Sequence, residues 1–560
     1  MENEHFDAVV VGSGFGGSVV TYRLAEAGLR VCLLERGHAY PPDAYPRTPK
    51  AMQGALWDPS AGGYGMFDLW SFGGLEALVA SALGGGSIIY ANVLLRKDES
   101  WFVNEDPHGT GHTPWPVRRV DLDPHYDAVE AMMNVQRYPI EHAPYDRTPK
   151  TNAFRAAADQ LGLDWSRPPL AVTFANEGKD PALGEPIEER WPNLHGRTRT
   201  TCRLCAECDV GCNYGSKNTL DFNYLSAAKH EGADIRTLHE VRTLAPQTGG
   251  GYRIRYVQHD LEREGDSFDT RSLPLQTMTA DRLILSAGTL GSTFLLMKSR
   301  SAFPNLSDAL GTRFCGNGDL LGFVLNAREN GAPRMLDPNY GPVITSTIRV
   351  GDALDGGDAT GRGFYIQDAG YPAFMSWIVE ASNIFGSLRR FIRFLRHTLL
   401  ARIQGDTNLS AELQHLLGGD LSASAMPLLG MGRDRPNGVF ELQDNGRLNT
   451  NWAMQGSKDY FDRLKRTMED LADAMGGDFV VNPTWLLKRV ITVHPLGGCP
   501  MGRTASEGVV DAHGEAFGHP DLYVADGSIL PGPVGPNPSL TIAALADRIA
   551  QRIIEERSAP

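Results

Sequence analysis

The sequence predicts an α/β protein whose first part adopts a Rossmann-type fold, and three observations lead to this prediction. An apolar run at 6–11 indicates a buried strand, and a glycine-rich turn follows it at once. Apolar residues at helical spacing come next and stop at Gly28. A second apolar run, 30–34, ends in Glu35. Strand, glycine turn, helix, strand and terminal acid in this order are typical of dinucleotide-binding folds.

Each part of this motif has a mechanical reason. Gly12 allows the tight turn, Gly14 lets backbone N–H groups approach a pyrophosphate, and Gly17 lets the helix pack closely on the strand. Glu35 can accept a hydrogen bond from a ribose hydroxyl. The motif fits FAD and NAD equally, so other parts of the chain must decide between them.

The overall composition excludes some classes of function. The chain has 560 residues, enough for two large domains or three to four smaller ones. Acidic residues outnumber basic ones by 67 to 53, and the net charge of −14 argues against nucleic-acid binding. The first residues lack an export signal, and the uncharged stretch 77–95 is interrupted by glycines 84–86. We therefore expect a cytoplasmic protein without a transmembrane helix.

Three blocks near the end of the sequence point to a family. Residues 491–499 read Ile-Thr-Val-His-Pro-Leu-Gly-Gly-Cys, 522–528 read Leu-Tyr-Val-Ala-Asp-Gly-Ser, and 532–541 read Gly-Pro-Val-Gly-Pro-Asn-Pro-Ser-Leu-Thr. In these blocks the sequence resembles the glucose–methanol–choline (GMC) family of FAD oxidoreductases, and most of all its cholesterol-oxidase branch. The resemblance spans the whole chain and is weakest at 100–200 and 325–480.

The resemblance implies two domains. A discontinuous FAD-binding domain of Rossmann type is expected from 1–100, 215–325 and 490–560. A sheet-based substrate-binding domain is expected from 101–214 and 326–489, with the cysteine-rich motif 202–212 at the boundary.

The resemblance also implies an active site. It places His494 and Asn537 as catalytic residues facing the flavin ring. It places the cofactor against the glycine turn at Gly85, Gly86 and Ser87, and against Asp526 and Gly527 beside the flavin phosphate or ribityl chain. Family members that attach FAD covalently have a histidine shortly after the glycine turn, where this chain has Ile88, Ile89 and Tyr90. We therefore expect non-covalent FAD.

The chemistry of alcohol oxidation agrees with these residue types. A neutral imidazole such as that of His494 can accept the hydroxyl proton, and the amide of Asn537 can donate to the oxygen that gains negative charge. The alternative for these two residues is a buried hydrogen bond and a turn cap. We expect oxidation of an apolar, sterol- or terpenoid-like alcohol, with O₂ or another external electron acceptor. A sugar or polyol dehydrogenase and an electron-transfer flavoprotein subunit are the alternatives.

One departure from the cholesterol-oxidase pattern concerns steroid isomerisation. Those enzymes carry a glutamate base in a short segment that ends in proline, and the matching stretch here is 364–372. The alignment places Gln367 at the glutamate position, and an amide cannot shuttle protons. Asp368 would take that role only if the alignment slips by one residue.

Four of the seven cysteines lie within eleven residues, as Cys202, Cys205, Cys208 and Cys212. Their spacing is that of ligands to a [4Fe–4S] cluster in bacterial ferredoxins, although Asn213 replaces the usual proline. A tetrahedral zinc site is the alternative, and buried thiols without a metal are a third interpretation. A cluster near the flavin would favour a dehydrogenase that passes single electrons to an external acceptor.

The segment 374–403 combines apolar residues at helical spacing with interleaved arginines. A basic amphipathic helix of this kind is typical of peripheral membrane contact. The alternative is a helix that covers a hydrophobic substrate cavity.

Overall fold

The first sheet is centred on β1 (Glu4–Val11), which pairs in parallel with β2 and β15. The computed structural model describes residues 4–107, 109, 111–375 and 423–558. The order of the strands in this sheet is β12 (Asp234–Arg236), β2 (Val31–Leu34), β1, β15 (Gln276–Leu285), β14 (Tyr252–Gln258) and β13 (His239–Pro246), with β26 (Leu522–Val524) also paired to β15. Only β13 and β14 join it by antiparallel pairing. The predicted Rossmann-type α/β fold is confirmed.

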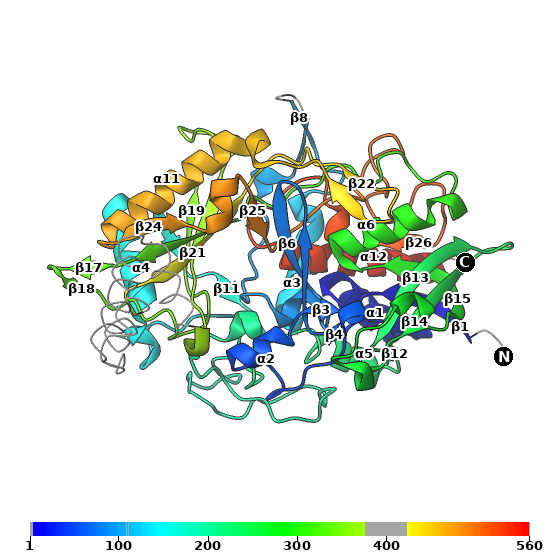
Figure 1. The fold of residues 1–560 in the computed structure, drawn as a ribbon, viewed down its shortest axis with the longest axis horizontal. Coiled ribbons are helices and arrows are strands. Elements are labelled where there is room, and N and C mark those ends of the chain that lie inside the picture. Colours follow the sequence, from blue (N-terminus) through cyan, green and yellow to red (C-terminus); the bar gives the residue numbers. More distant parts are fainter. Residues whose placement is uncertain (1–3, 108, 110, 376–422, 559–560) are drawn as a thin grey trace, which may run out of the picture.

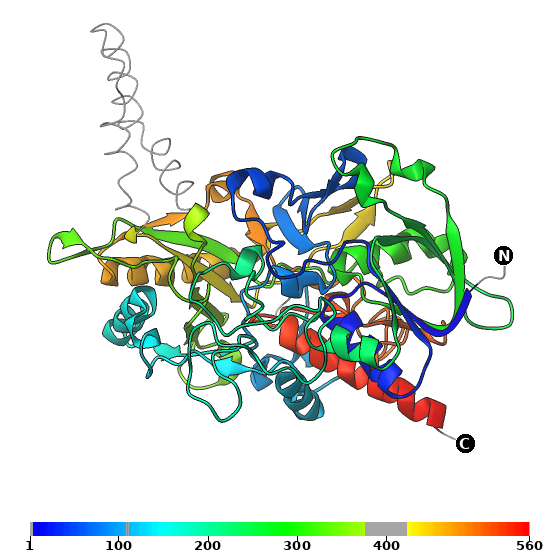
Figure 2. The same cartoon turned by 90° about the horizontal axis from the view of Figure 1, so that it is seen from below.

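Helices cover this sheet and bury its apolar strands. Helix α1 (Phe15–Glu26) packs against α5 (Tyr224–His230) and α12 (Ser539–Ser558), and α12 also contacts α3 (Arg119–Met132) (Figure 2). Helix α6 (Gly288–Ser299) packs against β13. All four residues of β2 are buried, as the interior strand of a parallel sheet requires.

The second sheet is antiparallel throughout. Its strand order is β10 (Asp164–Ser166), β19 (Thr347–Val350), β20 (Phe364–Asp368), β21 (Met426–Gly432), β16 (Leu320–Leu325) and β24 (Asp478–Val481). Helix α11 (Lys458–Ala474) packs along it and against α4 (Pro149–Leu161) (Figure 1). Tyr460, Leu464, Met468 and Leu471 are buried at helical spacing on α11.

Alternation along two strands of the second sheet separates its two faces. On β16, Leu320 and Val324 belong to the core under α11, whereas Leu321 and Phe323 line a cavity. On β21, Met426 and Leu428 face that core, whereas Pro427 and Leu429 line the cavity. Successive side chains of a strand point to opposite faces, so one sheet supplies both a core and a cavity wall.

A third, three-stranded sheet brings the late His494 block next to an early part of the chain. It consists of β25 (Val490–Thr492), β6 (Leu75–Ala80) and β5 (Phe67–Ser71), with β25 parallel to β6. The remaining short elements are helix α2 (Pro49–Gln53) and the strand pairs β3 (Trp57–Asp58) with β4 (Gly63–Tyr64), β7 (Val103–Glu105) with β8 (His112–Pro114), β9 (Gln136–Arg137) with β11 (Pro169–Leu170), β17 (Arg328–Glu329) with β18 (Ala332–Pro333), and β22 (Phe440–Leu442) with β23 (Leu448–Thr450).

The domain bounds stay a prediction, although one strand and one helix differ from it. β16 falls in the predicted FAD-domain segment 215–325 but pairs into the second sheet. α3 falls in the predicted substrate domain but packs on α12 of the nucleotide half. Within the described ranges, no helix is both long enough and apolar enough to span a bilayer.

Candidate active site

The glycine turn after β1 has the geometry that its sequence predicts. Gly12 has a φ of +98°, and a Cβ there would lie 2.3 Å from the carbonyl oxygen of Ser286. A Cβ on Gly17 would lie 1.9 Å from the Gly12 carbonyl oxygen, so helix and turn are in close contact. A Cβ on Gly14 would have no described atom within 4 Å, which leaves the backbone there open to the cavity.

The second glycine turn packs directly on the first. Gly85 has a φ of +52°, and a Cβ on it would lie 2.5 Å from the Cα of Gly14. The Ser87 hydroxyl donates to the Gly84 carbonyl at 2.7 Å, and the Leu220 N–H donates to Ser87 Oγ at 3.1 Å. Of the predicted residues in this turn, Gly86 lines the cavity, while Gly85 and Ser87 shape the turn behind it.

Glu35 directly follows β2, and Ser13 links it to both glycine turns. Oε2 of Glu35 accepts from Ser13 N at 3.0 Å and from the Ser13 hydroxyl at 2.6 Å, and Oε1 accepts from Gly37 N at 2.9 Å. Ser13 Oγ in turn accepts from Gly84 N at 3.0 Å. Glu35 and Ser13 both line the cavity, although the sequence pattern singled out only the glutamate.

Asp526 anchors the turn that follows β26. Its carboxylate accepts hydrogen bonds from Gly288 N at 3.0 Å, from Ser528 N at 2.8 Å, and from the hydroxyls of Ser292 and Ser528. Burial raises the pKa of Asp526, and these four bonds oppose that rise. Asp526 and Gly527 line the cavity, as does the open backbone of Gly14.

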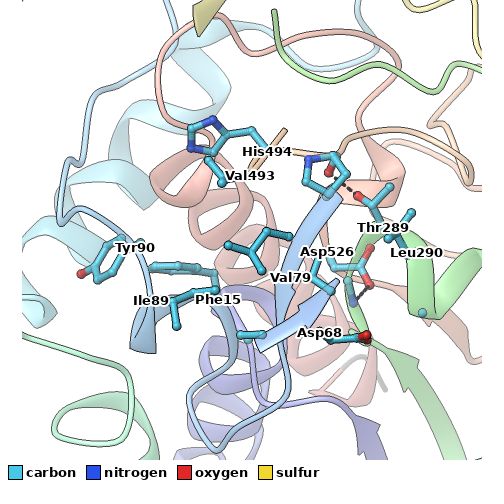
Figure 3. Close-up of a pocket in the computed structure, with 18 of the residues that line it drawn as sticks. Phe15, Asp68, Val79, Ile89, Tyr90, Thr289, Leu290, Val493, His494 and Asp526 are labelled. Atoms are coloured by element: carbon cyan, nitrogen blue, oxygen red, sulfur yellow. Dashed lines mark hydrogen bonds between the residues drawn. The ribbon is translucent and has the colours of Figure 1, made fainter. Parts of the chain in front are cut away.

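One cavity of about 960 Å³ connects these residues to the predicted catalytic pair. Gly12, Gly14, Glu35, Gly86, Asp526, Gly527, His494 and Asn537 all line it. Figure 3 shows Phe15, Ile89 and Tyr90 on one side of this cavity and Thr289, Leu290 and Asp526 on the other, with His494 and Val493 between them in the view. The Thr289 hydroxyl donates to the Pro495 carbonyl at 2.7 Å and so holds the residue after His494.

His494 is oriented by Asp319. Imidazole Nδ1 lies 2.8 Å from Asp319 Oδ1, and Asp319 is 1% exposed. Asp319 Oδ2 accepts from the N–H groups of Val493 at 2.8 Å and His494 at 3.1 Å. A carboxylate that accepts these bonds requires the proton on Nδ1, which leaves Nε2 as a proton acceptor. No motif in the sequence assigned a role to Asp319.

Asn537 is oriented by Gln367. Gln367 Nε2 donates to Asn537 Oδ1 at 2.7 Å, and Gln367 is fully buried. Because Oδ1 is engaged in this way, the Nδ2 group of Asn537 is left as the donor on the cavity side. Gln367 itself does not line the cavity, so it acts through Asn537.

Asn317 holds the backbone that carries Asn537. Its Nδ2 donates to the carbonyls of Gly535 at 3.3 Å and Pro536 at 3.1 Å, and Gly535 N donates to its Oδ1 at 2.9 Å. Asn317 and Asp319 stand two residues apart in one turn, so this turn positions both predicted catalytic residues.

Asp368 is unavailable as a catalytic base. It is fully buried, and Lys150 Nζ donates to its Oδ2 at 3.0 Å. Its Oδ1 accepts from Thr345 N at 3.0 Å and Ser346 N at 2.7 Å, and the residue does not line the cavity. The alternative of a one-residue slip, with Asp368 as the isomerisation base, finds no support in this geometry.

The four clustered cysteines do not form a metal site in the described structure. No group of three or more histidine, cysteine, aspartate or glutamate residues in the described ranges is arranged to hold a metal ion. Burial raises the pKa of the Cys202, Cys205 and Cys208 thiols. The predicted iron–sulfur cluster, and the zinc alternative, are therefore not supported.

Asp209, in the short 3₁₀ turn Cys208–Val210 of the cysteine-rich segment, lines the cavity, and burial raises its pKa to about 7. A single aspartate among cysteines gave no sequence signal for this position. Nearly all of the predicted amphipathic helix 374–403 lies outside the described residues.

The comparisons with known proteins agree with this site. Residues 449–546 match the family model for GMC oxidoreductase, and residues 10–47 match the NAD(P)-binding Rossmann-like domain. A cholesterol oxidase of Mycobacterium tuberculosis is 30% identical over 97% of this chain and 90% of its own. The chain belongs to the GMC oxidoreductase family, as the sequence predicted.

More distant relatives cover the chain almost as fully. A cholesterol oxidase of Acinetobacter baumannii is 27% identical over 100% of this chain and 97% of its own. A long-chain-alcohol oxidase of Arabidopsis thaliana is 25% identical over 98% of this chain and 67% of its own. The crystal structure of pyridoxine 4-oxidase from Mesorbium loti has a TM-score of 0.54 at 17% identity and covers 98% of both chains, which shows a shared fold.

The family and the Rossmann-like match imply FAD, and the residues present fit it. The open backbone at Gly14 and Gly86 is the cradle that a pyrophosphate and a flavin edge need, because a side chain there would project into the cavity. Glu35 lines the cavity directly after β2, where it would accept a hydrogen bond from a ribose hydroxyl. Membership of the family makes the chain an FAD-dependent oxidoreductase.

Proposed function

We propose that this protein oxidises the hydroxyl group of an apolar alcohol, with a sterol- or terpenoid-like alcohol as the first candidate substrate. The observation that supports this most is the pairing of His494 with Asp319 on the wall of a cavity that also contains the open glycine turns. FAD, when bound there, supplies the acceptor for the hydride that leaves the alcohol carbon.

His494 is proposed to take the hydroxyl proton. With Nδ1 protonated toward Asp319, Nε2 carries a lone pair. The buried Asp319 carboxylate then stabilises the imidazolium that forms, because the two charges lie close together away from water. This proton transfer would raise the electron density on the substrate oxygen and so favour hydride loss from the adjacent carbon.

Asn537 is proposed to hold the substrate oxygen. Its Nδ2 group donates to the oxygen as negative charge develops, and Gln367 keeps the amide from rotating. The cavity wall formed by Leu321, Phe323 and Leu429 favours an apolar substrate body over a sugar. The proposal therefore ranks a sterol or long-chain alcohol above a polyol.

Replacement of His494 tests the catalytic role. We expect His494→Ala to lower kcat by roughly 10²–10⁴-fold, because the general base is lost, while flavin absorbance of the purified protein is kept. The matched control is His5→Ala, an exposed histidine paired with Asp281. Unchanged turnover of sterols and long-chain alcohols in His494→Ala would refute the assignment.

A metal is not part of this proposal. Iron, zinc and acid-labile sulfide measured on anaerobically purified protein would test the prediction made for Cys202, Cys205, Cys208 and Cys212. Stoichiometric iron with sulfide would restore electron transfer to an external acceptor. Flavin without either metal would leave these cysteines a structural role, and peroxide formation under air would then identify O₂ as the acceptor.

A further inference from the structure

Asp209 is a carboxyl group on the cavity wall that the proposed mechanism does not use. It is half-buried, and no described residue gives it a hydrogen bond or an ion pair. It belongs to the 3₁₀ turn Cys208–Val210, far in sequence from the elements that carry His494 and Asn537. A carboxyl group left without a protein partner in a largely apolar cavity is costly unless a ligand or water completes its hydrogen bonds.

The two cations that attract Asp209 are already fully engaged. Lys217 Nζ donates to the carbonyls of Ile88, Tyr90 and Cys208 at 2.7–3.0 Å. Lys150 Nζ donates to Val343 O at 3.1 Å, Thr345 Oγ1 at 3.4 Å and Asp368 Oδ2 at 3.0 Å. An ammonium group has three N–H donors, so neither lysine has one left for Asp209. Both lower the energy of a negative charge at Asp209 without occupying its lone pairs.

The neighbours of Asp209 place it between the second glycine turn and the second sheet. Its neighbour Cys208 packs in one apolar cluster with Val343, Ile344 and Ala369. Its other neighbour, Val210, packs in a cluster that includes Ile88 and has Met375 against it. Val343, Ile344, Ala369 and Met375 all line the cavity.

We propose that Asp209 is a specificity residue that accepts a hydrogen bond from a second donor group on the substrate. This inference rests on the proposed function and narrows it: the preferred substrate is an apolar alcohol that carries a further hydroxyl or an ammonium group away from the carbon that is oxidised. The lone pairs of Asp209 bind that group, the apolar wall binds the carbon skeleton between, and His494 with Asn537 binds the reacting hydroxyl.

The test compares four ten-carbon probes with the holoenzyme: the plain primary alcohol, the α,ω-diol, the α,ω-amino alcohol and the α,ω-methoxy alcohol, which has an acceptor but no donor. A second pair, cholesterol and 25-hydroxycholesterol, covers sterols. We measure kcat/KM for each probe, and also the Kd from perturbation of the flavin spectrum under anaerobic conditions. The variants are Asp209→Asn and Asp209→Leu, with Glu207→Gln as the matched control, because Glu207 lies in the same segment, pairs with Arg47 and does not line this cavity.

We expect kcat/KM and Kd to favour a donor-bearing probe by about tenfold over its methoxy or unsubstituted partner. For the symmetric diol, this preference comes on top of the statistical factor of two. A tenfold preference corresponds to one net hydrogen bond of about 1.4 kcal/mol. Asp209→Leu should abolish the preference, and Glu207→Gln should keep it. Whether the diol or the amino alcohol shows it identifies the second group.

Two outcomes would overturn the inference. One is a wild-type enzyme that binds and oxidises all probes without regard to the second donor. The other is an Asp209 variant that keeps the preference for donor-bearing probes but changes the flavin spectrum or kcat equally for every probe. That result would assign Asp209 to the flavin. If no alcohol is oxidised, the proposed function fails, but the same preference in Kd, lost in Asp209→Leu, would still support the binding role.

Discussion

The two ends of the cavity are built in opposite ways. At the nucleotide end the decisive groups are backbone atoms, and Gly12, Gly14 and Gly17 lie within six residues of one another. At the reacting end the decisive groups are side chains, and each is held by a partner far along the chain: His494 by Asp319 and Asn537 by Gln367. The first end depends on the absence of Cβ atoms, and the second depends on the presence of a particular hydrogen-bond partner.

The largest effect expected from this difference is at Asp319. In Asp319→Asn, if the amide oxygen accepts from the backbone N–H groups of Val493 and His494, its NH₂ group faces imidazole Nδ1. That arrangement moves the ring proton to Nε2 and removes the proton acceptor. We expect kcat to fall by roughly 10²–10⁴-fold with FAD still bound. Steady-state kinetics on flavin-normalised protein measures this.

Asp547→Asn is the matched control for that change. Asp547 is also buried and lies 2.6 Å from a histidine, His125 Nδ1, but neither residue lines the cavity. This variant should lose stability and keep its turnover per bound flavin. Equal losses of turnover in both variants would mean that Asp319 acts only by supporting the fold.

A smaller effect is expected at the nucleotide end. Gly14 has an ordinary φ of −70°, so Gly14→Val should fold normally, but its side chain would project into the cavity. We expect the Kd for FAD to rise by about tenfold or more, measured by titration of apoprotein with FAD. Gly28→Val is the control, because Gly28 is exposed and has a φ of +77°. This variant should lose about 1–2 kcal/mol of stability without a change in FAD affinity.

The smallest effect is expected in the pH dependence of stability, at Asp434. This residue contacts the turn that carries Asn317 and Asp319. Burial raises the pKa of Asp434 to about 7. Its Oδ2 accepts a hydrogen bond from Gly316 N at 3.0 Å, and its Oδ1 has no partner in the described structure. The folded protein thus binds this proton more tightly than the unfolded chain, so stability is lost as pH rises from about 4 through about 7. Asp434→Asn should remove that loss, so the variant should be more stable than the wild type at pH 8 but not at pH 4. Thermal unfolding at the two pH values tests this, and an equal change at both would contradict it.

The same contrast explains which features could be predicted from the sequence. The glycine turn is local, because strand, turn and helix follow one another and each glycine has its own steric reason. His494 and Asn537 were predicted as catalytic residues because their blocks resemble a family. The family is confirmed, and the two catalytic roles stay a proposal. The roles of Asp319 and Gln367 depend on contacts across 175 and 170 residues, which no local pattern contains. Asp209 was hidden because its cysteine neighbours favoured a metal interpretation.

The second sheet was harder to predict for a different reason. Leu320 and Leu321 are the same residue type, yet one packs under α11 and the other lines the cavity. Alternation predicts that they face opposite sides, but not which side is open. That choice is made by the packing of α11 and α4, whose residues come from distant parts of the chain.

The position of β26 has a consequence for synthesis of the protein. β26 completes the first sheet beside β15, and its turn carries Asp526, so the sheet that begins with β1 is incomplete until residues 522–526 have emerged from the ribosome. At about 5–20 residues per second, that delay after β1 is roughly 25–100 s. Because β15 ends at Leu285, it waits roughly 12–48 s of that time for β26 and Asp526 at the same rate. We therefore expect cofactor loading to follow translation.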